Sequence, residues 1–197
     1  MDYKSKLEQL IINNQGLILT KMVDQEGIPR PYLSKLAKEG RLEKVSHGVY
    51  LSPEAFEDEM YCLQARNTRV IFSHETALFL HDLTDRDPIS WSITVPAGYN
   101  GSNLRAAGIK VYAIKKDLYE LGLIESKTQF GRSIKTYDME RTICDIVRSR
   151  SQIDIGILMD ALKKYSKRSD KSISTLMRYG EAFGITKMLK QYMEVLL

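Results

Sequence analysis

The alternation of apolar and polar positions predicts a run of helices at the start of the chain. Apolar residues recur at helical spacing in two segments: Leu7, Leu10 and Ile11 in the first, and Tyr32, Leu33, Leu36 and Ala37 in the second. Between these segments, Thr20 suits the N-cap of a further helix and Gly27 suits its left-handed end. Pro29 and Pro31 fit the first turn of the helix that follows, which Gly40 closes. The pattern therefore predicts a leading helix and then a helix-turn-helix.

Two short β-prone runs follow this pair of helices. They cover residues 42–45 and 49–51, and they are joined by Ser46-His47-Gly48, which is typical of a hairpin turn. A helix-turn-helix completed by such a hairpin is a winged helix-turn-helix, whose second helix enters the major groove of DNA. Residues 1–53 are therefore predicted to form a DNA-binding domain.

Basic residues outnumber acids in the part of this domain that would meet DNA. Between Ile28 and Gly48 there are five basic residues and two acids. Ser34, Lys35 and Lys38 share the helix face opposite the apolar stripe, where cations reach phosphates and short polar groups reach base edges. The candidate DNA contacts here are Arg30, Tyr32, Ser34, Lys35, Lys38, Arg41, Lys44 and His47. The alternatives are an ordinary solvated helix face and a winged helix that binds protein.

The rest of the chain predicts a connecting helix and a second domain. Phe56, Met60 and Leu63 recur at helical spacing after Pro53, so residues 54–66 are predicted to be a connecting helix. Strands are expected at 69–72, 89–95, 109–114 and 128–137, a helix capped by Ser73 at 73–81, and a flexible loop around 98–103. Three apolar stripes after residue 138 predict helices to the end. The expected fold class is α+β: the winged domain, then a mixed α/β domain over 67–197 that ends in a helical bundle.

Composition favours a globular protein with a localised basic surface. The net charge is +4, with 43% hydrophobic and 27% charged residues, which is ordinary for a soluble protein. No apolar run approaches the length of a membrane span, and the first ten residues have no signal-peptide core. We therefore expect a cytoplasmic protein with no membrane partner. Cys62 and Cys144 match no metal spacing and are expected to be buried thiols.

Three segments occur in an order that resembles a known family. They are Glu43-Lys44-Val45-Ser46-His47-Gly48-Val49-Tyr50, Phe72-Ser73-His74-Glu75-Thr76-Ala77-Leu78, and Tyr137-Asp138-Met139-Glu140-Arg141-Thr142-Ile143-Cys144-Asp145. With them the chain resembles, over nearly its whole length, the AbiEi antitoxins of bacterial abortive-infection (phage-defence) systems. The resemblance implies a repressor of its own operon and a partner gene for AbiEii, a nucleotidyltransferase-like toxin. It also implies a type IV system, in which antitoxin and toxin need not touch, with antitoxicity in the C-terminal domain.

The alternative function is a DNA-targeted enzyme such as a metal-dependent nuclease. Asp138, Glu140 and Asp145 lie close together in sequence, as the carboxylates of such a site would. Helical spacing instead makes Asp138 an N-cap and makes Arg141 and Asp145 an i,i+4 ion pair. Two histidines seven residues apart, at 74 and 81, lack the further ligands that a metal site needs. We expect no catalytic residues, no metal and no cofactor.

A second basic segment lies near the end of the chain. Between Lys163 and Lys190 there are eight basic residues and two acids. The candidate contacts are Arg168, Lys171 and Arg178, which flank the start and the middle of one predicted helix. The segment is either a second contact to DNA or RNA, or a solvated helical surface. Because no coiled-coil heptads appear, we expect a monomer or weak dimer that binds an inverted repeat cooperatively.

Overall fold

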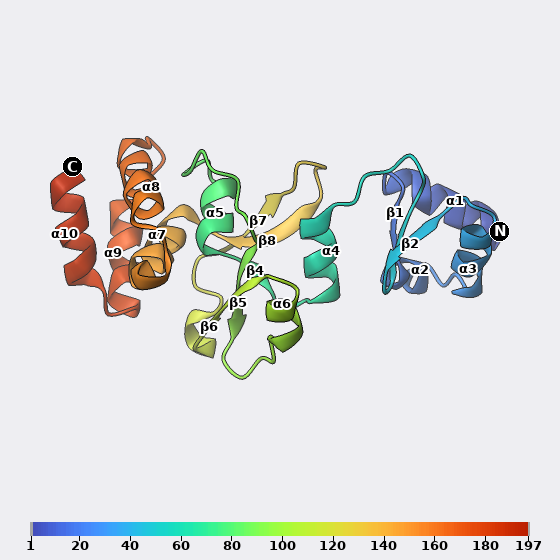
Figure 1. Ribbon diagram of the computed structural model, residues 1–197, viewed down its shortest axis with the longest axis horizontal. Coiled ribbons are helices and arrows are strands. Elements are labelled where there is room, and N and C mark those ends of the chain that lie inside the picture. The colour runs from blue at the N-terminus through green and yellow to red at the C-terminus, as the bar shows by residue number, and fades with distance from the viewer. Residues whose placement is uncertain (1, 197) are drawn as a thin grey trace. The chain divides into compact units, whose positions relative to one another are not determined.

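The chain divides into two compact units in the computed structural model, which describes residues 2–196 (Figure 1). The first unit covers residues 1–62 and the second covers residues 63–197. The predicted fold class is confirmed, because a winged helix-turn-helix unit is followed by a mixed sheet and a helical end.

The N-terminal unit consists of three helices and a small antiparallel sheet. Its elements are α1 (Tyr3–Asn13), β1 (Leu17–Leu19), α2 (Thr20–Gln25), α3 (Pro31–Lys38), β2 (Glu43–Ser46) and β3 (Val49–Leu51). The strands lie in the order β1-β3-β2. The buried core is made of Leu7, Ile18, Val23, Ile28, Leu33, Leu36 and Leu42. The predicted apolar stripes therefore do pack together, and the helix pair and hairpin are confirmed.

Strand β1 explains why the expected start of α2 is wrong by one position. Leu19 pairs with Val49 across the sheet, and the amide of Thr20 donates to the carbonyl of Gly48 at 2.9 Å. Thr20 is thus the first helical residue, and Leu19 holds the N-cap position without a side-chain hydrogen bond. The chain passes directly from strand to helix, so no separate capping side chain is used. The other end is as expected, because Gly27 has a φ of 66°.

The connecting helix is shorter than predicted. Helix α4 spans Glu59–Arg66, and residues 53–58 are not helical. The carboxylate of Asp58 accepts from the amide of Tyr61 at 3.1 Å and so caps the helix. Pro53 therefore begins a turn rather than a helix, and Phe56 is left 77% exposed. Further along α4, Gln64 exchanges two hydrogen bonds with the backbone of Lys135, at 2.6 and 2.7 Å.

The C-terminal unit contains a five-stranded mixed sheet in the order β6-β5-β4-β8-β7. The strands are β4 (Ile71–Phe72), β5 (Ser92–Pro96), β6 (Lys110–Ile114), β7 (Leu123–Lys127) and β8 (Ser133–Tyr137). Pairs β4–β8 and β5–β6 are parallel, and pairs β4–β5 and β7–β8 are antiparallel. The region predicted as one strand over 128–137 is therefore half of a hairpin, whose first strand, β7, the sequence analysis missed. The strand predicted from Ile89 starts later, at Ser92, and Ile89 is fully exposed at 106%.

Six helices complete this unit as it is described. They are α5 (His74–Leu80), α6 (Ser102–Ala106), α7 (Met139–Arg148), α8 (Ile155–Lys167), α9 (Ile173–Ala182) and α10 (Thr186–Leu196), with single 3₁₀ turns at Lys116–Leu118 and Arg150–Gln152. Helix α6 begins within the last two residues of the segment expected to be a flexible loop. Buried residues of α5 and of α7 to α10 form one apolar core, and Figure 1 shows α7 to α10 gathered on one side of the sheet. The helical bundle predicted after Asp138 is confirmed.

Candidate nucleic-acid interface

Helix α3 presents the predicted polar face to solvent. Leu33 and Leu36 are 1% and 3% exposed and anchor the helix in the core. Ser34, Lys35 and Lys38 are exposed on the other side, and neither lysine has an ion-pair partner among the contacts described. Two unpaired ammonium groups and a hydroxyl on one face suit a backbone-and-base contact with DNA.

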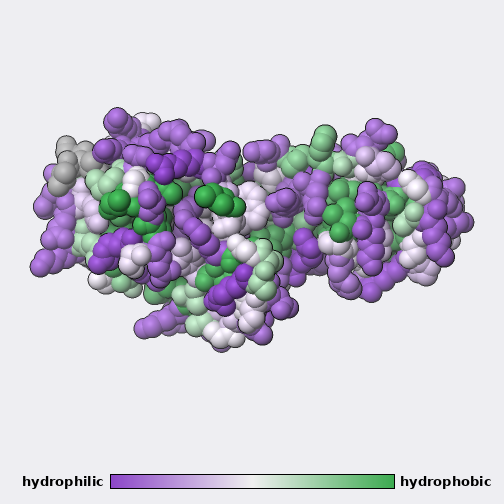
Figure 2. Space-filling view, viewed as in Figure 1, coloured by the Kyte–Doolittle hydropathy of each residue, from purple (hydrophilic) through white to green (hydrophobic). Residues whose placement is uncertain are grey.

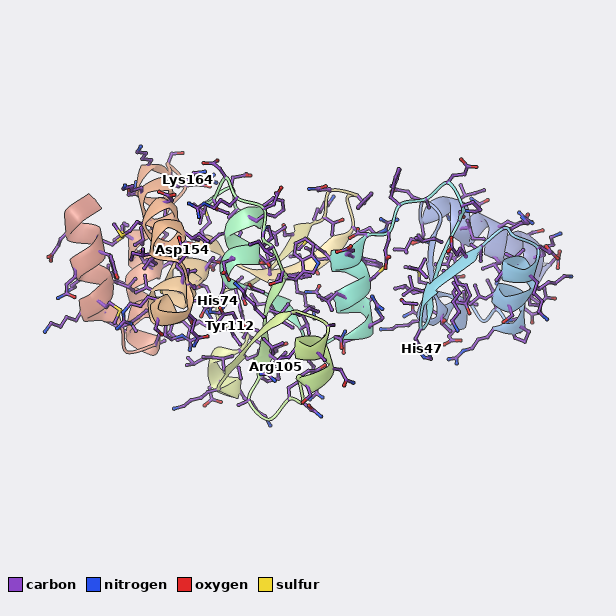
Figure 3. The ribbon with its side chains drawn as sticks, in the orientation of Figure 1. His47, His74, Arg105, Tyr112, Asp154 and Lys164 are labelled. Atoms are coloured by element: carbon purple, nitrogen blue, oxygen red, sulfur yellow. The ribbon has the colours of Figure 1, made fainter. Side chains whose placement is uncertain are left out.

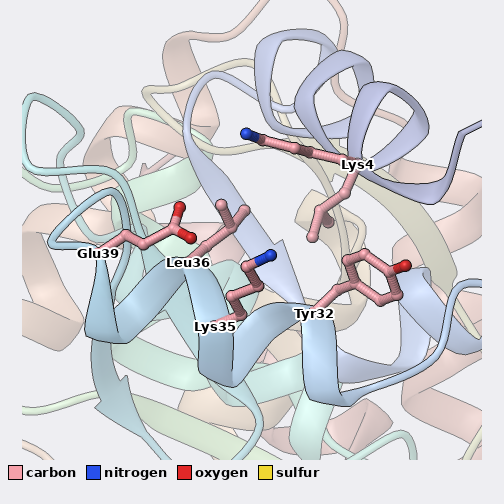
Figure 4. Close-up of a pocket in the computed structure, with 6 residues that line it drawn as sticks. Lys4, Tyr32, Lys35, Leu36 and Glu39 are labelled. Carbon is pink, nitrogen blue, oxygen red and sulfur yellow. The ribbon is translucent and has the colours of Figure 1, made fainter.

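One edge of this face turns toward α1. Tyr32, Lys35 and Glu39 line a small pocket with residues of α1, as Figure 4 shows. The ring of Tyr32 lies 5.7 Å from the ring of Tyr3, at a tilt of 56°. Tyr32 therefore supports the packing of α3 on α1 and is only partly exposed. Lys38 and Ser34 lie on the part of α3 away from this pocket.

Two of the candidate arginines are already paired. Arg30 donates two hydrogen bonds to Asp24, at 2.8 and 2.7 Å, and this contact lowers the pKa of the Asp24 carboxyl. Arg41 donates to Glu8 at 2.7 Å. Both pairs are exposed, so DNA phosphates can compete for the guanidinium groups. Each arginine must release a carboxylate before it binds a phosphate, and its net effect on affinity is therefore smaller than that of Lys35 or Lys38.

The wing carries the last two candidates of this unit. Lys44 lies on β2 opposite Tyr50, and His47 lies in the turn between β2 and β3. Both side chains are exposed, and Figure 3 places His47 at the tip of the hairpin. Gly48 completes the turn with a φ of 73°, a conformation that favours glycine. The eight candidates of the winged domain thus lie on α3, at its N-terminal end, on the hairpin, or in the segment between α3 and β2.

The winged domain has a recognisable relative among known protein families. Residues 5–53 match the family described as "Transcriptional regulator, AbiEi antitoxin". The winged domain is similar to this family. Over a longer stretch, the crystal structure of the Rv2827c protein from Mycobacterium tuberculosis is similar to this chain with a TM-score of 0.64 and 14% identity, and the match covers 96% of this chain and 76% of that one. At this identity the likeness shows a shared fold alone. No curated protein matches the chain.

The three C-terminal candidates lie in different settings. Arg168 follows α8 and donates two hydrogen bonds to Asp170, both at 2.8 Å. The ammonium group of Lys171 donates to the carbonyl of Arg168 at 3.0 Å. Arg178 is exposed in the middle of α9, with its guanidinium 5.4 Å from the ring centre of Tyr179. Arg168 and Lys171 thus share the loop between α8 and α9, and Arg178 is the candidate with the freest cation.

The carboxylates that suggested a nuclease each have a structural partner. Asp138 caps α7 by accepting from the amide of Arg141 at 2.7 Å, as predicted, and it also accepts from the hydroxyl of Tyr179. Glu140 accepts from the hydroxyl of Tyr165 and the amide of Ser172. In residues 2–196 no three His, Cys, Asp or Glu side chains come close enough to hold a metal, and no helix there is long and apolar enough to cross a membrane. Cys62 and Cys144 are buried thiols, as expected.

Arg141 makes the predicted ion pair with Asp145, and the pair is entirely buried. Its Nε donates to the Asp145 carboxylate at 3.0 Å, and Nη1 donates to the carbonyls of Leu118 and Leu121, each at 2.7 Å. The guanidinium also stacks on the rings of Tyr137 and Phe183, 4.1 and 4.5 Å from their centres. Helical spacing gave the pair, but it gave no indication that the pair would tie α7 to the segment before β7.

His74 is the centre of a second buried polar network that the sequence analysis did not detect. Its Nδ1 lies 2.9 Å from Ser73 Oγ and its Nε2 lies 3.0 Å from Ser149 Oγ. The ring stacks on Tyr112 at 3.5 Å, as the labelled pair in Figure 3 shows, and the backbone has a φ of 50°. Ser73 holds the N-cap position of α5 but does not cap it, because its hydroxyl accepts from Thr94 and contacts the imidazole.

Burial keeps His74 uncharged in the folded protein. Loss of water lowers its pKa well below 6.5, and repulsion from Arg148, Arg141 and Lys110 adds to the effect. At pH values between the folded and unfolded pKa of His74, the imidazole is protonated in the unfolded chain and neutral in the folded chain. The free energy of unfolding is therefore expected to fall as the pH drops below 6.5, by up to about 1.4 kcal/mol per pH unit.

The control for this pH effect is His74→Asn, because asparagine tolerates a positive φ and does not titrate. Urea unfolding of both proteins at pH 7.5, 6.5 and 5.5 should show a steeper loss for the unsubstituted chain. Equal pH slopes for the two proteins would mean that His74 does not limit acid stability.

Proposed function

We propose that this chain is a DNA-binding antitoxin that represses its own toxin-antitoxin operon and counteracts a nucleotidyltransferase-like toxin without needing to touch it. The observation that carries the proposal is the solvent-facing, unpaired basic side of α3 (Ser34, Lys35 and Lys38) inside an AbiEi-type winged domain. Such a regulator works in the cytoplasm, where its promoter lies. We propose no catalytic role, since the carboxylates of residues 138–145 are used in capping, hydrogen bonds and an ion pair.

The direct test is binding of the purified protein to the DNA upstream of its own gene. We expect the promoter fragment to shift in a gel at about 1–50 nM protein. A fragment of scrambled sequence should need a far higher protein concentration to shift. Coexpression with the neighbouring reading frame should relieve growth arrest if that frame encodes the toxin. Equal affinity for specific and scrambled DNA would refute repression, and unrelieved arrest would refute antitoxicity.

The proposed stoichiometry is two copies on one inverted repeat. A single recognition helix contacts few base pairs, which is too little for selection within a genome, so paired half-sites are needed. We expect sedimentation of a monomer or weak dimer without DNA, and a footprint over both half-sites that appears at a single protein concentration. A tight dimer in the absence of DNA, or protection of an isolated half-site, would contradict this arrangement.

Reversal of the C-terminal basic residues tests whether this second segment binds nucleic acid. We expect Arg168→Glu, Lys171→Glu and Arg178→Glu together to weaken binding to all DNA sequences by a similar factor, since phosphate contacts are independent of base identity. The factor should be about tenfold to a hundredfold at physiological salt if all three side chains meet phosphates. A gel shift on operator and scrambled DNA measures it.

The matched control reverses three exposed lysines elsewhere in the same unit, Lys115, Lys116 and Lys127. Both variants change the net charge by the same amount. A loss of DNA binding confined to the first variant therefore depends on where the charges lie. Normal DNA binding with failed rescue from the toxin would assign the segment to antitoxicity. If both binding and rescue survive, the segment is only a solvated surface.

A further inference from the structure

The helical end of the C-terminal unit contains an open, methionine-lined groove. It has a volume of about 430 Å³ and is lined by Arg150, Met159, Met188, Gln191 and Tyr192. Ile155, one turn before Met159 on α8, is 65% exposed. Figure 2 shows that hydrophobic surface (green) does interrupt the polar surface over this end of the chain. Methionine side chains adapt to the shape of an apolar ligand, so a groove of this kind suits an inserted side chain.

A largely exposed aromatic side chain lies in the segment before α4. Phe56 is 77% exposed in a stretch with no helical or strand structure. Glu54 and Glu57 lie on either side of it, and Glu59 follows at the start of α4. A large aromatic ring held in water between acidic residues gains free energy from any apolar pocket that also offers positive charge.

The groove offers that charge. Arg150 is one of its walls, Lys163 lies one helical turn after Met159, and Lys187 lies one turn before Gln191. Lys163 and Lys187 are both exposed. The chain thus carries an aromatic anchor flanked by carboxylates and an apolar groove flanked by cations. Complementary charge around an apolar contact is the pattern that gives an interface its specificity and its register.

We propose that Phe56 of one copy inserts into this groove of a second copy, and that its acidic neighbours meet Arg150 and the rim lysines. The contact is reciprocal when two copies are related by a two-fold axis, since each supplies one anchor and one groove. One side chain per groove is too little for a stable dimer in solution. When DNA holds two copies together, the high effective concentration lets two such contacts form, and they supply the cooperativity of operator binding.

Disulfide capture tests the contact without DNA, so its result is independent of the proposed function. A variant with Glu57→Cys and Gln191→Cys should give disulfide-linked dimers at about 100 μM protein, a concentration chosen for a weak contact. The natural thiols are buried, and the two single-cysteine variants are the controls. A disulfide within one chain, or no disulfide at all, would overturn the proposal.

The cooperativity of DNA binding tests what the Phe56 contact is proposed to do on the operator. This second experiment rests on the proposed function. Phe56→Ala and Met159→Glu should each reduce the preference for paired over single half-sites by about tenfold or more, with single half-site affinity unchanged. An equal mixture of the two variants should recover part of the cooperativity, because one intact anchor can meet one intact groove. Ile89→Ala removes another exposed apolar side chain and should change nothing.

The possible outcomes distinguish the Phe56 contact from the proposed repressor function. Dimer capture without specific DNA binding would support the contact and refute the repressor. Specific binding with full cooperativity in Phe56→Ala would refute the contact and leave the repressor intact. Loss of cooperativity in both Phe56→Ala and Met159→Glu, with no recovery when the two are mixed, would also refute the contact. A reciprocal contact requires that the intact anchor of one variant meets the intact groove of the other.

Discussion

Replacing Lys35 and Lys38 together by alanine is expected to weaken operator binding about tenfold to a hundredfold. Both ammonium groups are exposed on α3, and no ion pair described for them has to be broken before they meet a phosphate. Each lost phosphate contact also removes the release of about one counterion. The slope of log affinity against log salt should therefore become shallower by about one unit per lysine. Gel shifts at several salt concentrations measure both quantities.

The matched control for this variant is Lys115→Ala with Lys116→Ala, which removes the same charge from the C-terminal unit. It should leave affinity and salt slope nearly unchanged. Arg30→Ala and Arg41→Ala should each cost less affinity than either α3 lysine, because both arginines must first leave Asp24 or Glu8. An unchanged salt slope in the α3 double variant would exclude this helix face from the interface.

Replacing Arg141 by methionine should destabilise the C-terminal unit by about 3–5 kcal/mol, the largest effect on stability that we expect. The side chain has no exposed surface, and its loss leaves the carboxylate of Asp145 with one guanidinium partner instead of two. The carbonyls of Leu118 and Leu121 also lose their donor. Buried acceptors without donors pay their full desolvation penalty. Urea unfolding of the full chain, followed through the C-terminal transition, gives the difference.

A second variant separates the buried charge from the lost packing. Asp145→Leu added to Arg141→Met removes the buried carboxylate that has lost one of its two guanidinium partners, so part of the stability should return. Arg148 then becomes the group without its acceptor, which keeps the recovery incomplete. An Arg141→Met protein within about 1 kcal/mol of the unsubstituted chain would show that the buried pair has little influence on stability.

Local patterns predicted the helices of the winged domain well because short-range interactions determine where these helices end and which face is buried. The positions that end α2 and α3, Gly27 and Gly40, both adopt positive φ, and the buried leucines of α3 follow the helical period. Asp138 also caps α7 as its place in the sequence indicates. Each of these features depends on residues within about one helical turn of one another, so a single stretch of sequence contains the information.

Features that depend on distant partners were missed or misplaced. Strand β1 has three residues and forms only because Leu17, Ile18 and Leu19 pair with residues of β3 that lie thirty or more positions later. Strand β7 is stabilised by its pairing with β8, although its own sequence alternates poorly. The predicted helix start at Pro53 failed for a different reason, since Asp58 provides a cap closer to the buried part of α4.

The sequence by itself determined where the chain can turn, which helix faces are apolar, and that one exposed helix face would be basic. These properties follow from the φ preferences of glycine and proline and from the helical period, which act within a few residues. Only the tertiary structure decided that Arg141 and His74 would be fully buried, that Arg30 would be paired with Asp24, and that Phe56 would remain in water. Burial and charge pairing depend on which distant segments meet. That meeting is set by the packing of the whole unit, which no local pattern encodes.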